Sequence, residues 1–187
     1  MTLILVGLLL WAAVHFIPSL APDLKTSLKN RLGEGGYMGL FSLALVAALV
    51  LMVFGWRSVE QPTHYYTLPL WTRDAGMGLI LVAMILFMAS KPPTRIRRII
   101  RHPQLTGLIV WALAHLMMNG DNRSVLLFSG LAVWGALEIL LINRREGEWV
   151  KPEAPSWGKE IVVVLIGCVA YAIFAFAHPW LAGVAVF

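Results

Sequence analysis

Two histidines inside apolar segments each follow a tryptophan by four residues, in Trp11-Ala-Ala-Val-His15 and in Trp111-Ala-Leu-Ala-His115. Residues four apart share one face of a helix, so each tryptophan lies one turn before its histidine. A titratable ring inside a membrane is costly without a partner, and neutral imidazole is a common axial ligand of haem iron. The pattern therefore suggests a flat cofactor held between helices. The alternative is two polar rings hydrogen-bonded inside a helix bundle.

Composition identifies the kind of protein that carries these motifs. Apolar residues make up 59% of the 187 residues, charged residues make up only 13%, and the mean hydropathy is +0.76. A soluble domain carries about one quarter charged residues, so we expect an integral membrane protein. The length suits a single transmembrane domain over residues 1–187. The lone Cys168 excludes an internal disulfide.

Six apolar segments approach the roughly 20 residues that a helix needs to cross a bilayer. They predict an all-α bundle of six transmembrane helices. Proline lies near the ends of several segments, where it is typical of helix boundaries. The predicted spans are Thr2 to Ile17, Tyr37 to Trp56, Leu70 to Ala89, Gln104 to Met118, Ser124 to Ile142, and Ile161 to about Leu181.

The basic residues predict the orientation of this bundle. All but three of the 15 lysines and arginines follow the first, third or fifth span, the exceptions being Arg57, Arg73 and Arg123. Positive residues stay in the cytoplasm, so both termini should lie outside, in the periplasm of a bacterial inner membrane. This asymmetry explains the net charge of +5, and nucleic-acid binding is not needed to account for it.

Smaller features predict helix packing and contact with the membrane surface. Residues 22–30 and 94–101 suit short interfacial helices, the second with isoleucines set against arginines. Gly35 and Gly39 offer small residues for close packing of the second span. Gly107 offers the same to the fourth span.

Further candidate residues lie around the ends of the spans. Arg101 and His102 open the fourth span, where Arg101 suits an anionic group such as a haem propionate or a phosphate. His102 is either an interfacial residue or a further ligand. Glu138 is expected to pair with Arg144 or with the arginines near Arg101.

The segment from Asn119 to Arg123 has the chemistry of a tight turn. Asn119 and Asp121 are candidates there, although turn formation already explains both. His178, before Pro179, is a further candidate at the outer end of the last span. We expect His64, in an outer loop, to be a surface residue.

Several segments together resemble the NnrU family. They are Leu-Leu-Trp-Ala-Ala-Val-His-Phe-Ile-Pro-Ser at 9–19, Gly-Glu-Gly-Gly-Tyr-Met-Gly-Leu-Phe-Ser at 33–42, Arg-His-Pro-Gln-Leu-Thr-Gly at 101–107, Trp-Ala-Leu-Ala-His at 111–115 and Asn-Gly-Asp at 119–121. The family is named for a requirement in bacterial nitrite and nitric oxide reduction. Its plant relatives include 15-cis-zeta-carotene isomerase, a membrane enzyme that depends on haem b.

The resemblance implies haem b with His15 and His115 as iron ligands, and His102 as a further matched histidine. Trp11 and Trp111 would flank the cofactor. Two classes of function remain open. One is a haem-dependent isomerase or redox enzyme acting on a lipophilic substrate. The other is a non-catalytic membrane partner or haem-handling factor for denitrification reductases.

Residues 101–107 also resemble the Arg-His-Pro signature of membrane methyltransferases that use S-adenosylmethionine. Leu105 stands where those enzymes usually have tyrosine, and Glu146 and Glu148 are not the adjacent acidic pair that they carry. We interpret this likeness as fold ancestry more than shared chemistry.

Overall fold

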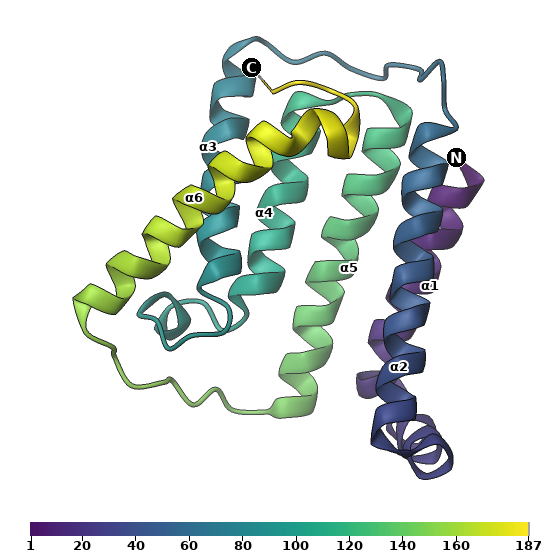
Figure 1. The fold of residues 1–187 in the computed structure, drawn as a ribbon, viewed down its shortest axis with the longest axis vertical. Helices are drawn as coiled ribbons and strands as arrows, with labels where there is room; N and C mark the ends of the chain where they lie inside the picture. Colours follow the sequence, from purple (N-terminus) through teal and green to yellow (C-terminus); the bar gives the residue numbers. More distant parts are fainter. Residues whose placement is uncertain (187) are drawn as a thin grey trace. The chain divides into compact units, whose positions relative to one another are not determined.

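Helices account for nearly all of the regular structure in the computed structural model, which describes residues 1–186 (Figure 1). Within these residues there is no strand, only an isolated bridge between His64 and Asp121. The elements are α1 (Thr2–Leu20), α2 (Pro22–Arg57), α3 (Trp71–Met88), the 3₁₀ turn η1 (Ile96–Arg98), α4 (Pro103–Met118), α5 (Asn122–Glu146) and α6 (Trp157–Ala182).

Each predicted span corresponds to one of these α-helices. Across residues 1–186, five of the helices are long and apolar enough to cross a membrane, and α4, with 16 residues, is shorter. Large apolar side chains are exposed along several helices; Leu43 is 67% exposed and Phe176 is 75% exposed. Such extensive apolar surface is typical of helices that contact lipid, and it is rare in proteins surrounded by water. The all-helical fold predicted from the sequence is therefore confirmed, and the apolar helices are compatible with a multi-pass membrane protein.

Three local features differ from the sequence predictions. The helices α1 and α6 continue past Pro18 and Pro179, which lie in their last turns, so each helix lacks one backbone hydrogen bond close to its end. Residues from Pro22 onward are helical as expected, but they run into α2 through a kink at Gly33, whose φ of 71° favours glycine. Only η1 forms within 94–101, and the Glu160 carboxylate accepts the N–H groups of Arg95 and Ile96 at its start.

The helices form two compact units that interleave along the sequence. The first unit contains residues 1–68 and 119–147, and therefore α1, α2 and α5. In it, α1 packs on both α2 and α5. Gly7 permits the contact with α2, because a Cβ atom there would lie 2.8 Å from the carbonyl oxygen of Ala48. Gly35 and Gly39 do not serve the expected packing, since a Cβ atom at either would meet nothing within 4 Å.

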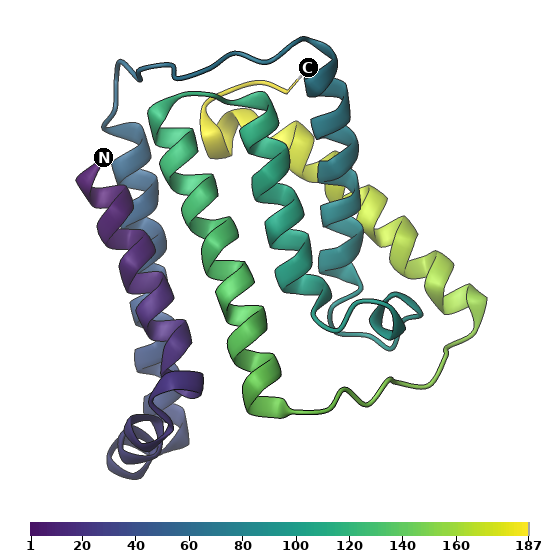
Figure 2. The ribbon, with the colours of Figure 1, turned by 180° about the vertical axis from the view of Figure 1, so that it is seen from behind.

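The second unit contains residues 69–118 and 148–187, and therefore α3, α4 and α6. In it α3 packs on α4 and on α6, and the α3–α4 pair is clear from behind (Figure 2). Gly107 permits the first contact as predicted, because a Cβ atom there would lie 3.1 Å from the carbonyl oxygen of Ala83. Gly167 of α6 packs equally closely on Ile85 of α3.

Candidate functional site

His15 and Trp11 form a locally determined arrangement on α1. The Nδ1 atom of His15 lies 2.9 Å from the carbonyl oxygen of Trp11, and the two ring centroids are 4.5 Å apart. A carbonyl oxygen only accepts hydrogen bonds, so Nδ1 must carry the proton and donate it. The lone pair then lies on Nε2. A backbone acceptor at Nδ1 commonly orients histidines whose other nitrogen binds a metal.

His115 and Trp111 repeat this arrangement on α4, in the other unit. The His115 Nδ1 atom lies 2.8 Å from the carbonyl oxygen of Trp111, and the ring centroids are again 4.5 Å apart. The repeated sequence motif therefore produces the same local geometry twice. In each copy the imidazole is held by its own helix and presents the Nε2 side away from the backbone carbonyl.

Trp134 of α5 completes the cluster around His15. Its ring centroid lies 4.8 Å from that of His15 and 5.4 Å from that of Trp11, and Phe41 of α2 lies 5.6 Å from His15. Sequence reasoning missed Trp134 and Phe41. A signal was present for Trp134, because Trp134-Gly-Ala-Leu-Glu138 is another tryptophan four residues before a titratable group.

Buried polar atoms without partners gather on these residues. The Nε1 atoms of Trp11 and Trp134 and the Oε2 atom of Glu138 are buried and take part in no hydrogen bond within residues 1–186. Trp134 and Glu138 are each only 6% exposed. An unsatisfied buried polar group costs about 1–3 kcal/mol, so native proteins rarely keep one without a ligand or water to satisfy it. Trp11 and Trp134, which lie against His15, and Glu138, one turn after Trp134 on α5, are therefore candidate residues of a binding site.

The expected ion pair of Glu138 does not form in the described part of the chain. Neither Arg144 nor any other basic group there lies within 4.0 Å of its carboxylate. The neighbouring Arg145 instead donates to Ser19 Oγ at 2.8 Å and to Glu146 Oε1 at 3.3 Å. These contacts hold the ends of α1 and α5 together, one turn or more beyond Glu138.

His178 of α6 lies beside His115 in the second unit. The two ring centroids are 6.5 Å apart and the ring planes differ by 23°. The Nδ1 atom of His178 lies 2.6 Å from the carbonyl oxygen of Val184, so this ring too has its lone pair on Nε2. The tertiary structure thus places a second histidine next to His115 from a distant part of the sequence.

His102 lies at the opposite end of α4 from His115. It directly precedes Pro103, the first residue of the helix, and its carbonyl oxygen accepts the N–H of Thr106. At about 1.5 Å per residue, His102 and His115 are about 20 Å apart along the helix axis. Arg101 lies at this same end, so neither residue is placed at the His115 ring.

Residues match the model of the NnrU protein family from position 3 to position 186, nearly the whole chain. The chain belongs to the NnrU family. No match was found among curated proteins or among solved structures.

In this NnrU protein, Asn119 and Asp121 form the tight turn predicted from their sequence. Asp121 caps α5 by accepting the Ser124 N–H at 3.1 Å, and it pairs with Arg123 at 3.4 Å. The loop carrying His64 docks here, because Tyr65 N–H donates to the Gly120 carbonyl at 2.8 Å. Burial and the negative charge of Asp121 raise the pKa of the Tyr66 phenol in this loop.

The histidines of this NnrU protein offer single or paired ligands. Across residues 1–186, no group of three or more His, Cys, Asp or Glu side chains is arranged to hold a metal ion. A haem, whose porphyrin supplies the other ligands, needs only one or two axial side chains.

Proposed function

We propose that this NnrU protein binds haem b in the membrane, with His15 and His115 as iron ligands. The observation that carries the proposal is the repeated Trp/His geometry. Both imidazoles donate Nδ1–H to a backbone carbonyl and keep a lone pair on Nε2, the state in which a histidine binds iron. When bound, haem supplies an iron centre for redox or Lewis-acid chemistry.

The residues around His15 fit such a group. The buried N–H donors of Trp11 and Trp134 lack acceptors in the described part of the chain, and a haem carries propionate oxygens that accept hydrogen bonds. Trp11 and Trp111 each lie against their histidine and would exclude water from the iron. Arg101 and His102, at one end of α4, are proposed to meet an anionic group of the cofactor or substrate.

His178 is an alternative partner for His115. Its ring lies 6.5 Å from that of His115 within the same unit, and its Nδ1 is also occupied by a carbonyl. In this pairing the two residues that would hold the iron come from α4 and α6. The same set of histidine variants distinguishes it from the pairing with His15.

The first test measures the visible spectrum of purified protein and its single histidine variants. We expect a Soret band in the wild type that is lost or shifted in His15→Ala and in His115→Ala. His64→Ala is the matched control, because His64 is exposed in a loop, and its spectrum should be unchanged.

Two results would change the assignment. A wild-type spectrum in both His15→Ala and His115→Ala would show that the proposed ligands are wrong. Loss of the band in His178→Ala and His115→Ala, with His15→Ala unchanged, would instead support ligation from α4 and α6.

We propose six membrane crossings, with both termini on the periplasmic side of a bacterial inner membrane. The distribution of lysine and arginine supports this orientation. The 16 residues of α4 extend about 24 Å, against a hydrocarbon core of about 30 Å. Local thinning of the bilayer accommodates a difference of that size.

The activity proposed for the haem site is isomerisation or redox conversion of a lipophilic molecule that enters from the bilayer. A non-catalytic role beside a nitrite or nitric oxide reductase is the alternative. Material that co-purifies with the protein distinguishes the two. A bound polyene or similar lipid supports the enzyme, and a retained reductase subunit supports the partner role.

A further inference from the structure

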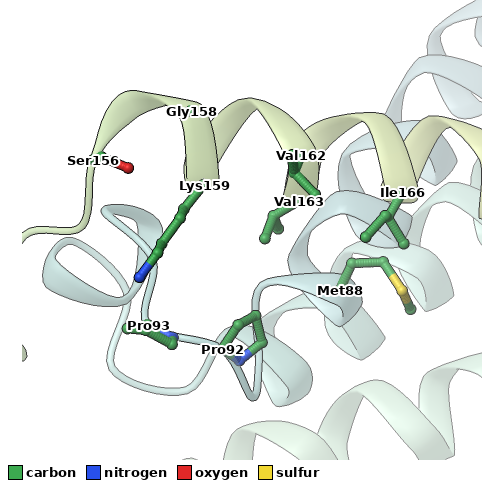
Figure 3. Close-up of a pocket in the computed structure, with 9 residues that line it drawn as sticks. All are labelled: Met88, Pro92, Pro93, Ser156, Gly158, Lys159, Val162, Val163 and Ile166. Carbon is green, nitrogen blue, oxygen red and sulfur yellow. The ribbon is translucent and has the colours of Figure 1, made fainter.

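A cavity of about 780 Å³ lies at the N-terminal end of α6, within the second unit (Figure 3). One wall comes from the end of α3 and the segment after it, and the other comes from the first turns of α6. The lining residues are Met88, Pro92, Pro93, Ser156, Gly158, Lys159, Val162, Val163 and Ile166. None of them belongs to the histidine sites, so a ligand in this cavity would be independent of haem.

A buried carboxylate holds the two walls in place. Glu160 of α6 is 8% exposed, and it accepts the N–H of Arg95 at 2.7 Å and that of Ile96 at 3.3 Å. The Arg95 guanidinium lies 4.1 Å from the ring centroid of Trp157. These contacts tie the segment that follows Pro92 and Pro93 to the start of α6. They therefore fix the spacing between the two walls of the cavity.

The lining changes from polar to apolar along α6. Ser156, Gly158 and Lys159 lie at the first turn, and Val162, Val163 and Ile166 follow (Figure 3). From Lys159 to Ile166 the helix rises about 10 Å. A ligand that fits this lining has an anionic group at one end and a hydrocarbon chain at the other.

Charge in the first turn of α6 selects an anion. The Lys159 side chain points toward Pro93 across the cavity (Figure 3). Ser156 makes no side-chain capping hydrogen bond within residues 1–186, and Glu160 is the acidic residue of the first turn. The Glu160 carboxylate accepts two backbone N–H groups from the opposite wall, and these donors offset part of its negative charge.

We propose that this cavity binds one anionic phospholipid of the bilayer. Its phosphate contacts Lys159 and the N-terminal turn of α6, and an acyl chain lies along Val162, Ile166 and Met88. Basic pockets between transmembrane helices on the cytoplasmic side commonly bind such headgroups. The apolar walls favour a lipid over free phosphate, because free phosphate has no hydrocarbon chain to contact them.

The test measures lipid retention by native mass spectrometry on the full-length protein. Delipidated protein is incubated in detergent with phosphatidylglycerol or phosphatidylcholine of identical chains. We expect preferential retention of phosphatidylglycerol and a loss of about fivefold in Lys159→Gln, the effect of one lysine near an anionic headgroup. Lys151→Gln is the matched control, since Lys151 lies over Trp149 before α6 and does not line the cavity.

A second variant tests the apolar wall. Val162→Trp fills the cavity from an exposed position on α6, and we expect it to reduce retention of phosphatidylglycerol without changing the helical circular dichroism spectrum. Equal retention of the two lipids, or equal losses in Lys159→Gln and Lys151→Gln, would overturn the proposal. So would displacement of the lipid by inorganic phosphate together with normal retention in Val162→Trp, because that pattern describes a site for free phosphate.

Discussion

An imidazole inside a membrane helix needs a partner for its N–H group, and here the helix itself provides one. The carbonyl four residues earlier accepts Nδ1–H in both His15 and His115, so the tautomer is determined before any tertiary contact forms. The tryptophan at that same position lies against the imidazole ring. In both motifs the residue pattern thus leaves the lone pair of the imidazole on Nε2.

A prediction at this scale concerns the two tryptophans. The double variant Trp11→Phe, Trp111→Phe should shift the haem spectrum or accelerate haem loss, because each indole covers its imidazole at 4.5 Å. Membrane insertion should persist, since phenylalanine remains apolar. Haem transfer to apomyoglobin measures the loss. Unchanged spectrum and retention would mean that both indoles serve ordinary packing.

Residues at the turn between α4 and α5 make contacts that stabilise the first unit. Asp121 caps α5, and Arg123 donates to the Val59 carbonyl at 3.1 Å while lying 4.5 Å from the ring centroid of Trp56. Gly120 is needed in this turn, because a Cβ atom there would lie 2.0 Å from the Tyr66 carbonyl oxygen. The cap of α5 and the tight turn before it therefore both have structural roles.

The prediction for this element is a loss of stability without a loss of haem ligands. Asp121→Ala removes the cap of α5 and should lower the free energy of unfolding by about 0.5–2 kcal/mol. Asp121→Asn keeps an oxygen that accepts the Ser124 N–H, and should retain most of that stability. Denaturation followed in mild detergent measures both. Equal losses in the two variants would assign the effect to the charge pair with Arg123.

At the scale of the whole molecule, we expect the basic residues to determine the orientation of the helices in the bilayer. Reporter fusions at Gly33, Pro93 and Gly147 should report the cytoplasm, because each lies in or beside a lysine- and arginine-rich connection. Fusions at Thr63 and Asn122 should report the periplasm. An odd number of crossings would place the two termini on opposite sides and contradict the proposed topology.

The helices, their approximate bounds and the Trp/His geometry were predictable from the sequence, because apolar segment length and i, i+4 contacts are local properties. The presence of Trp134 beside His15, and of His178 beside His115, was decided only by tertiary structure. Lipid chains are as apolar as leucine, so hydropathy marks which segments enter the membrane but does not determine which helices meet.

The same limit explains the incorrect predictions for charged and small residues. Glu138 lacks the expected ion pair, and Glu160 instead accepts two N–H groups of the segment after α3. Gly107 lies at a helix contact, whereas Gly35 and Gly39 do not. Glu138 and Glu160 carry the same carboxylate, and the three glycines are chemically identical. Only the packing of the helices determines which partner, if any, comes within reach of it.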